Sequence, residues 1–292
     1  MTMQALYDVA APAKLNLFLH VVGRRADGYH LLQSLFVLID WCDTLHFERR
    51  DDGSLARHDL GAALPADDLC LRAARLLKAE SGTALGTDIS IDKRAPSGAG
   101  MGGGSSDAAS TLLALNRLWG LGWPRERLLA LALTLGADVP FFVGGRNAIV
   151  EGIGERLTPV PVPPQWFAVV KPAASIETRA IFASPLLAHR GGAAIMESFA
   201  ANADQGALAP GFGANDLQAA AESECAQVKQ AAAVLRGQFG NSRMTGSGSA
   251  VFARAGTGVQ PVAAMPGDLA AGWVGRICRS LSEHPLVGWA DD

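Results

Sequence analysis

Residues 96–106 form the stretch of this chain best suited to bind an anion. Five of its eleven positions are glycine, which offers no side chain to a core and loses more conformational entropy on folding than other residues. Closely spaced glycines leave backbone N–H groups accessible, and N–H groups at the start of a helix bind phosphate. We therefore expect a phosphate-binding loop made of Pro96, Ser97, Gly98, Ala99, Gly100, Met101, Gly102, Gly103, Gly104, Ser105 and Ser106.

The elements on either side of this loop must position it. Residues 87–92 alternate polar and apolar side chains, as a half-buried strand does. Residues 107–119 place leucines at helical spacing, and Ser106 or Asp107 is predicted to cap that helix. A strand, a glycine-rich loop and a helix start in this order favour a nucleotide phosphate as the anion. A flexible surface linker is the alternative.

Two familiar types of phosphate loop do not account for the stretch. A Walker loop needs a lysine after its last glycine, and here two serines follow instead. The spacing Gly-x-Gly-x-x-Gly from Gly98 matches a dinucleotide fingerprint, but the chain then continues into a predicted helix, Arg125–Leu135, where that fold requires a second parallel strand. A third form remains, Pro-x3-Gly-(Leu/Met)-Gly-Gly-Gly-Ser-Ser.

A carboxylate and an ammonium could assist phosphoryl transfer, which usually needs a group that orients or deprotonates the attacking hydroxyl. Asp138 lies between a helix that ends near Gly136 and a predicted strand at 140–143. Lys14 lies near the start of a mostly apolar strand, 15–22, where an inward-facing lysine is costly unless it is paired. From the residues alone, an aspartate that caps a turn and a solvated Lys14 stay open as alternatives.

Two further loops carry candidate binding residues. Tyr29 and His30 follow a polar turn, where aromatic rings suit stacking against a base, although Tyr29 could equally fold back over the domain. Gly246 and Ser247 belong to a small-residue loop before a predicted strand at 250–253, and a plain hairpin turn is the alternative there. Residues 215–216 could simply cap the following helix.

Composition excludes several classes of protein. A net charge of −3 over 292 residues gives no electrostatic footprint for nucleic acid or an anionic membrane. No apolar run reaches the roughly 18 residues of a membrane helix, and Lys14 interrupts the only candidate signal peptide. The four cysteines form no C-x-x-C pair. We expect their side chains to be buried as small apolar groups, and the protein to lie in a reducing compartment. We expect a cytoplasmic protein, a monomer or weak homodimer.

The remaining patterns give an outline of the fold. Strands are predicted at 35–38, 44–49 and 166–170, and helices at 67–81, capped by Asp67 or Asp68 and ended by Gly82, and at 218–235. Four prolines at 159–164 favour a domain boundary, giving domains 1–163 and 164–292, although an exposed loop inside one domain is an alternative. Residues 188–213 have the least certain structure.

The loop form and four other motifs resemble the GHMP kinases, the small-molecule kinases named after galactose, homoserine, mevalonate and phosphomevalonate. The other motifs are APAKLNLFLH at 11–20, RADGYH at 25–30, GADVP at 136–140, and NDL at 215–217 with TGSGSAVFA at 245–253. They occur in the family's order over nearly the whole chain. Within that superfamily the chain resembles the kinases that act on 4-diphosphocytidyl-2-C-methyl-D-erythritol.

The resemblance implies an α+β fold of two domains, the first like ribosomal protein S5 domain 2 and the second ferredoxin-like. It implies transfer of a phosphoryl group from ATP, with Mg²⁺, to the 2-hydroxyl of the cytidyl substrate. Lys14 and Asp138 would be the catalytic pair, and the 96–106 loop with Lys93 would hold ATP. We name no protein ligand for the metal.

The resemblance also assigns the substrate side of the site. Tyr29 would stack on the cytosine and His30 would hydrogen-bond to it, while Phe182 would cover the other face of the ring. Asn16 would lie beside Lys14, and Gly246 and Ser247 would approach the phosphates from the second domain. The sequence departs from the family at Asp68, where relatives often carry an asparagine near adenine, and an ionised Asp cannot donate a hydrogen bond. Another GHMP kinase, a nucleotide sensor without activity and a nicotinamide-dependent oxidoreductase are the rival functions.

Overall fold

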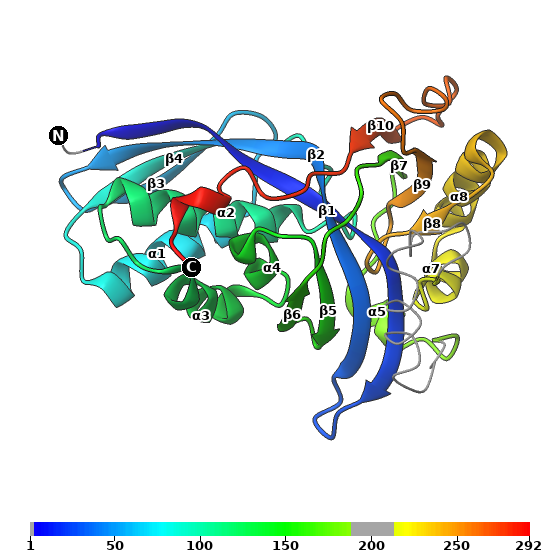
Figure 1. Ribbon diagram of the computed structural model, residues 1–292, viewed down its shortest axis with the longest axis horizontal. Coiled ribbons are helices and arrows are strands. Elements are labelled where there is room, and N and C mark those ends of the chain that lie inside the picture. The colour runs from blue at the N-terminus through cyan, green and yellow to red at the C-terminus, as the bar shows by residue number, and fades with distance from the viewer. Residues whose placement is uncertain (1–2, 188–212) are drawn as a thin grey trace.

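Two long antiparallel strands, β1 (Ala5–Arg24) and β2 (His30–Arg50), run through the computed structural model, which describes residues 3–187 and 213–292 (Figure 1). The first half of β2 pairs with β5 (Ala148–Gly152), and its second half pairs with β4 (Gly86–Asp92). β3 (Leu55–Asp59) and β6 (Arg156–Pro159) complete this sheet. The strands predicted at 35–38 and 44–49 are confirmed as parts of β2. The strand also continues between them, because buried Ile39 and Trp41 extend the alternating pattern.

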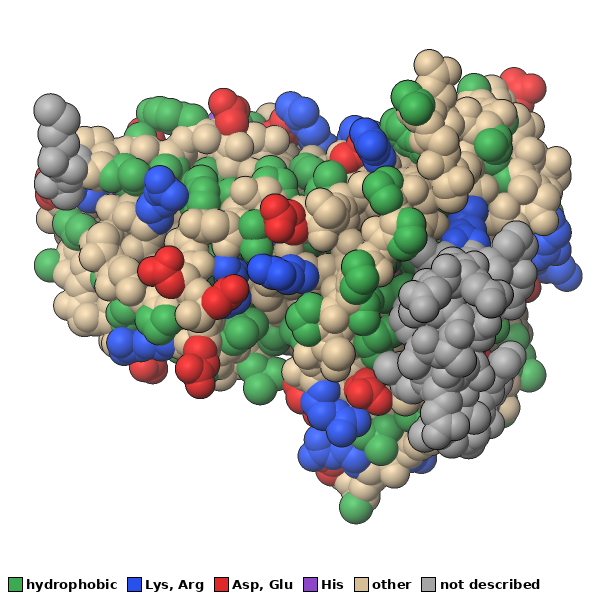
Figure 2. Space-filling view, viewed as in Figure 1, with side chains coloured by type: hydrophobic (Ala, Val, Ile, Leu, Met, Phe, Trp, Pro, Cys, Tyr) green, Lys and Arg blue, Asp and Glu red, His purple; other side chains and the backbone are tan. Residues whose placement is uncertain are grey.

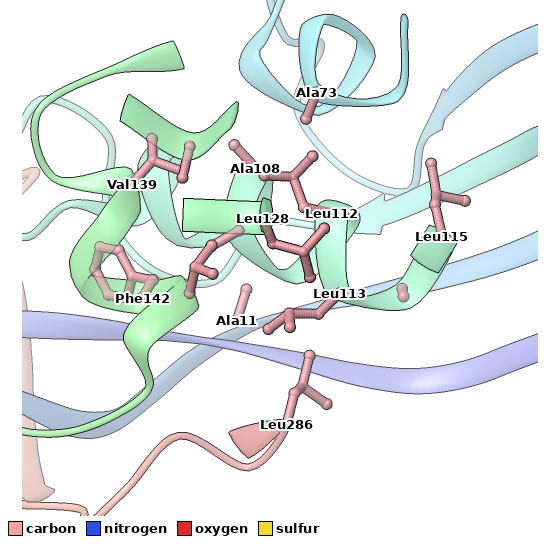
Figure 3. Packing of buried hydrophobic residues seen from close by; sticks show 14 of the residues in the cluster. Ala11, Ala73, Ala108, Leu112, Leu113, Leu115, Leu128, Val139, Phe142 and Leu286 are labelled. Atoms are coloured by element: carbon pink, nitrogen blue, oxygen red, sulfur yellow. The ribbon is translucent and has the colours of Figure 1, made fainter. Parts of the chain in front are cut away.

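Helices α1 (Leu69–Ser81), α2 (Gly103–Leu118), α3 (Arg125–Leu135) and α4 (Val139–Gly144) pack with this sheet. The ends of α1 confirm the prediction, since Asp68 accepts a hydrogen bond from the Leu71 N–H at 3.0 Å and Gly82 follows with φ +66°. α2 lies at the centre of the packing. Its side chains meet those of α1, α3, α4 and a segment near the end of the chain (Figure 3).

Two predictions in this region are wrong. α2 begins at Gly103, with Gly102 and not Ser106 or Asp107 at its N-cap, so the last glycines of the loop form the first helical turn. Residues 140–143 belong to helix α4 and not to a strand. Pro140 occupies the first turn of that helix, where no N–H is required, and a short apolar run does not by itself separate a strand from a buried helix.

A second, antiparallel sheet has the order β10 (Val274–Arg279), β7 (Trp166–Lys171), β9 (Val251–Gly256) and β8 (Arg243–Met244). α7 (Gln218–Glu224) and α8 (Ala226–Phe239) pack against it, and the short helix α5 (Thr178–Phe182) contacts α7. The single helix predicted at 218–235 is interrupted at Cys225, which has an extended backbone; nothing in the local sequence explains the break.

Residues 281–292, which follow the second sheet, return to the first part of the fold. Leu286 and Ala290 are buried in the core around α2, and Figure 1 places the end of the trace beside α3 and α4. The 3₁₀ turn Val287–Trp289 lies within this segment. The boundary after residue 163 stays a prediction, and the predicted uncertain segment 188–213 lies almost wholly outside the described residues.

The surface and the cysteines bear on the class of protein. Positive and negative side chains are interspersed on the face shown in Figure 2. Within the described ranges, no helix has both the length and the apolar character to cross a bilayer. Cys70 and Cys278 are buried, as predicted, whereas Cys42 and Cys225 are only partly buried; all four thiols are free.

Candidate active site

The glycine loop turns between β4 and α2 by means of alternating glycines. Gly98, Gly100 and Gly102 have φ values of +61°, +72° and +71°, in the left-handed region that disfavours other residues. Gly103 and Gly104 then form the first turn of α2. The first N–H groups of a helix have no intrahelical acceptor, and this end also carries the positive pole of the helix dipole. The predicted anion-binding geometry is therefore present.

A second loop, residues 245–249, lies directly against the first. The Ala250 N–H donates to the Ala99 carbonyl at 3.2 Å. A Cβ on Gly100 would lie 2.4 Å from the Thr245 carbonyl oxygen, and a Cβ on Gly246 would lie 2.6 Å from the Gly100 oxygen. Glycine is required at both positions because the two backbones touch. The loop that contains Gly246 and Ser247 therefore supports the glycine loop and is more than a hairpin turn.

The glycine loop forms one wall of a cavity of about 440 Å³, a volume within the roughly 300–1,000 Å³ range of small-molecule sites. Every predicted loop residue from Pro96 to Ser105 lines it, whereas Ser106 is buried behind the lining. The other walls come from the start of α1 with the segment before it, and from the two ends of the loop: Leu64, Pro65, Asp67, Asp68, Leu69, Lys93, Ala95 and Asp107.

Lys93 lines this cavity as part of a buried charge cluster. Its ammonium contacts the Asp43 carboxylate and lies 2.6 Å from Asp107 Oδ2. Asp43 also accepts hydrogen bonds from the backbone N–H groups of Arg94 and Ala95, at 2.6 and 2.7 Å. The cluster therefore ties β2, the start of the glycine loop and the N-terminal half of α2 together. Asp43 and its pairing with Lys93 were not predicted, because residues 50 positions apart give no local signal.

Asp107 is expected to make the protein less stable as the pH rises. Burial raises the pKa of its carboxyl from 3.8 to about 8, against the attraction of Lys93, and its Oδ1 has no hydrogen-bond partner among the described residues. Between these two pKa values the folded state holds a proton that the unfolded state has released, so the free energy of unfolding falls with pH in that window. Asp107→Asn, which cannot ionise, should remove this dependence of the urea midpoint on pH.

The matched control is Asp51→Asn, which removes a carboxylate that is 74% exposed. We expect that variant to keep the pH dependence of the original protein. An unchanged dependence in Asp107→Asn would show that Asp107 is ionised in the folded state.

Asp68 has a structural role that accounts for an acid at this position. It caps α1, and its Oδ1 lies 3.0 Å from an Nη atom of Arg57, which is itself largely buried. Arg57 also holds Asp59 in a two-point contact, at 2.7 and 3.1 Å. The ion pair between Asp68 and Arg57 therefore fixes the rim of the first cavity. A neutral asparagine could not form this ion pair.

A second cavity of about 240 Å³ contains most of the predicted substrate residues. Lys14, Asn16, Asp138, Phe182, Gly246 and Ser247 all line it. Gly100 and Gly102 line both cavities, so the glycine loop separates them. Two ligands, one bound in each cavity, would therefore come into contact beside Gly100 and Gly102.

Lys14 and Asp138 form an ion pair in the second cavity. Lys14 Nζ lies 3.4 Å from Asp138 Oδ2, donates to Asn16 Oδ1 at 2.6 Å and lies 4.2 Å from the centre of the Phe36 ring. Lys14 is only 3% exposed, so its side chain faces inward and the solvated alternative is excluded. The Asp138 side chain is 32% exposed. Burial lowers the pKa of Lys14, and Asp138 opposes this by favouring the ammonium. Their catalytic roles stay predictions.

Asn16 connects this pair to the rest of the site. Its backbone N–H donates to Thr245 Oγ1 at 2.9 Å, and its Nδ2 donates to Ser34 Oγ at 2.9 Å. With Lys14 on its Oδ1, the amide is hydrogen-bonded on both sides and its orientation is fixed. The 245–249 loop therefore contacts both the glycine loop and the strand that carries Lys14.

The predicted aromatic residues are only partly assembled. The His30 ring stacks on the Phe182 ring, with centroids 5.1 Å apart and planes 23° apart. Tyr29 is 62% exposed at the tip of the β1–β2 hairpin, and neither it nor His30 lines the second cavity. A base held between Tyr29 and Phe182 would require these side chains to leave the positions observed here.

Residues 215–216 tie the second sheet to β1. Asn215 Nδ2 donates to the carbonyls of Met244 and Gly246, both at 2.8 Å, and its Oδ1 accepts from the Leu217 N–H. Asp216 accepts from the Val21 N–H at 3.0 Å and lies 3.3 Å from His20 Nδ1. The prediction that these residues simply cap the following helix is wrong, because Leu217 is the N-cap of α7 and no side chain caps that helix. Asn215 instead holds the 245–249 loop in place.

Comparison with known proteins identifies the class. The family described as "GHMP kinases N terminal domain" matches residues 68–146, which include the glycine loop and Asp138. With two sheets and a phosphate loop between strand and helix, the fold and the site define a small-molecule kinase of the GHMP type.

Full-length relatives identify the particular family. A "4-diphosphocytidyl-2-C-methyl-D-erythritol kinase" of Methylibium petroleiphilum is 67% identical over 292 residues, covering 99% of this chain and 100% of the relative. One of Verminephrobacter eiseniae is 58% identical, covering 99% of each. A crystal structure of 4-(cytidine 5'-diphospho)-2C-methyl-D-erythritol kinase matches with a TM-score of 0.72 and 37% identity, covering 88% of this chain and 91% of that one. The chain belongs to the 4-diphosphocytidyl-2-C-methyl-D-erythritol kinase family.

Proposed function

We propose that this protein transfers the γ-phosphoryl group of ATP to the 2-hydroxyl of 4-diphosphocytidyl-2-C-methyl-D-erythritol, as a step in isoprenoid precursor synthesis. One observation carries the assignment of roles: the two cavities share Gly100 and Gly102, and the Lys14–Asp138 pair lies in the second cavity beside that shared wall. A phosphate over the loop and a hydroxyl beside Asp138 would be close together, which is the main requirement for phosphoryl transfer. The names of the relatives supply the acceptor.

In this mechanism the acceptor oxygen attacks the γ-phosphorus, and the bond from that phosphorus to the bridging oxygen of ADP breaks. The hydroxyl proton passes to Asp138, or Asp138 orients the hydroxyl until the proton is lost. Lys14 stabilises negative charge on the acceptor oxygen and on Asp138. The loop N–H groups and the start of α2 bind the phosphates of the donor.

ATP enters as its Mg²⁺ complex, so the metal belongs to the substrate. Magnesium is often held by phosphates with few protein groups, and the described ranges hold no group of three or more His, Cys, Asp or Glu residues that could form a separate metal site. We assign no protein ligand to it. Lys93, fixed between Asp43 and Asp107, lies in the nucleotide cavity.

The cytidine would be recognised by the aromatic residues of the hairpin tip and α5. Tyr29 would stack on the cytosine, His30 would hydrogen-bond to it and Phe182 would cover the other face. Asn16, Gly246 and Ser247 would contact the remainder of the substrate beside the catalytic pair. We place the enzyme in the cytoplasm as a monomer or weak homodimer.

The test is ADP release with Mg-ATP and, in parallel, the diphosphocytidyl methylerythritol, mevalonate and homoserine. We expect turnover with the cytidyl alcohol alone. Tyr29→Ala should raise KM for it by about tenfold or more, since stacking of a base on an aromatic ring contributes about 1–3 kcal/mol. Tyr7→Ala is the matched control, because Tyr7 is the other tyrosine of the chain and is 61% exposed.

Other outcomes would support the rival functions. Turnover with mevalonate or homoserine, unaffected by Tyr29→Ala, would indicate another kinase of the superfamily. ATP binding without turnover on any of these alcohols would favour a sensor. A rise in NADH fluorescence on titration with the protein would favour an oxidoreductase.

A further inference from the structure

α3 and α4 form a helical hairpin with Asp138 at its apex. α3 ends at Leu135, Gly136 and Ala137 make the turn, and Asp138 is the N-cap of α4. The open end of the hairpin brings Arg125, the first residue of α3, close to Val143 near the end of α4. Lys14 lies on β1, outside the hairpin. The distance between Lys14 and Asp138 therefore depends on how firmly the hairpin is held.

Arg125 closes the open end. Its Nη1 donates to the Val143 carbonyl at 2.7 Å, while its Nη2 donates to the carbonyls of Val287 and Ala290. Its Nε pairs with the exposed Asp292 carboxylate. Arg125 is only 7% exposed, and its hydrogen bonds to the Val143 and Ala290 carbonyls are buried, so water cannot readily replace the guanidinium there. One guanidinium thus joins α3, α4 and the 281–292 segment.

The 281–292 segment holds the same end of α4 by two further contacts. The His284 N–H donates to the carbonyl of Gly145, the C-cap of α4, at 2.8 Å. A Cβ on Gly145 would lie 3.1 Å from Val287, so the segment packs closely against the cap. Burial and the nearby Arg125 lower the pKa of His284 to about 3, so its imidazole is neutral and does not repel the guanidinium.

The position of α4 affects the reacting groups directly. Phe142 of α4 packs against the glycine loop, since a Cβ on Gly102 would lie 3.0 Å from its ring. Val139, next to Asp138, is fully buried in the core where α2, α3, α4 and Leu286 meet (Figure 3). A shift of this short helix would move Asp138 relative to Lys14, and a displacement of about 1 Å can lower a rate about 100-fold.

We propose that Arg125 is a positioning residue for phosphoryl transfer, which holds Asp138 in place by clamping the far ends of α3 and α4 to the 281–292 segment. The proposal rests on the proposed function, because it assumes that Asp138 serves the transfer. Arg125 touches neither cavity, and its effect passes through α4.

The test is a double-mutant cycle of Arg125→Lys with Asp138→Asn, read as kcat and as KM for both substrates. Lysine keeps the charge but cannot reach the three carbonyls in the fixed geometry of the guanidinium. We expect Arg125→Lys to lower kcat about tenfold or more in the original protein, with both KM values little changed. In the Asp138→Asn background the same substitution should lower kcat by less than about twofold, because residues that act through one another are not additive.

Arg127→Lys is the matched control: Arg127 lies on the same helix, stacks on Trp123 at 3.3 Å and is exposed. It should leave kcat unchanged. Equal losses from Arg125→Lys in both backgrounds would overturn the positioning role, as would an unchanged kcat or a variant that fails to fold at the assay temperature. Full activity of Asp138→Asn would instead refute the proposed function of the site.

Discussion

Asp138→Asn is expected to lower kcat by about 10²–10⁴-fold, the usual contribution of a placed acid or base. The amide has the size of the carboxylate but cannot take the hydroxyl proton, and it removes the negative charge opposite Lys14. The variant should fold, because Lys14 keeps its hydrogen bond to Asn16 and its contact with the Phe36 ring. The measurement is steady-state ADP release, with ATP affinity determined separately by calorimetry.

Asp40→Asn is the control for loss of a carboxylate. Asp40 accepts one hydrogen bond, from the Arg279 N–H at 2.9 Å, and lines neither cavity. Its substitution should leave turnover unchanged. If Asp138→Asn binds ATP normally and turns over at the rate of the Asp40 variant, then Asp138 is not the group that handles the proton.

Gly100→Ala is expected to abolish measurable ATP binding and activity. The added Cβ would lie 2.4 Å from the Thr245 carbonyl oxygen and 3.1 Å from both the nitrogen and the oxygen of Gly248. These are backbone atoms, so relief requires the two loops to separate, and the residue must also hold φ near +72°. Overpacking costs about 1–3 kcal/mol and the left-handed conformation about 1–2 kcal/mol more. Isothermal calorimetry with Mg-ATP measures the binding.

Gly104→Ala is the matched control in the same loop. Its Cβ would meet only a Leu69 methyl group at 3.7 Å, an ordinary contact, and Gly104 lies in the first turn of α2. We expect ATP binding close to that of the original protein. Equal losses in the two variants would mean that any side chain in the loop blocks phosphate, whereas equal retention would contradict the contact between the loops.

Local sequence signals predicted those parts of the fold that local interactions determine. The α1 cap at Asp68 and the end at Gly82 depend on residues within one turn, and both predictions are confirmed. The sequence does not locate the start of α2, because glycines are typical of loops, although Gly103 and Gly104 adopt helical geometry here. The α4 helix was missed because four apolar residues have no readable period.

Contacts between distant residues could not be predicted in this way. The Lys93 cluster depends on Asp43, and the clamp on α4 depends on Arg125 meeting residues more than 160 positions away. The motifs placed Lys14 and Asp138 correctly as neighbours through family resemblance, whereas periodicity alone left Lys14 either inward or outward. Neither source indicated that the His30 ring would stack on Phe182.

The most direct test of the account is the phosphorus NMR spectrum of the product formed from ATP and 4-diphosphocytidyl-2-C-methyl-D-erythritol. The 2-carbon carries a methyl group and no hydrogen, so a phosphate on the 2-hydroxyl has no three-bond coupling to a proton. We predict one new monoester signal without such coupling, formed together with ADP and about 10²–10⁴-fold more slowly with Asp138→Asn. A signal split by neighbouring protons would place the phosphate on another hydroxyl, and the absence of any new monoester would contradict the proposed reaction.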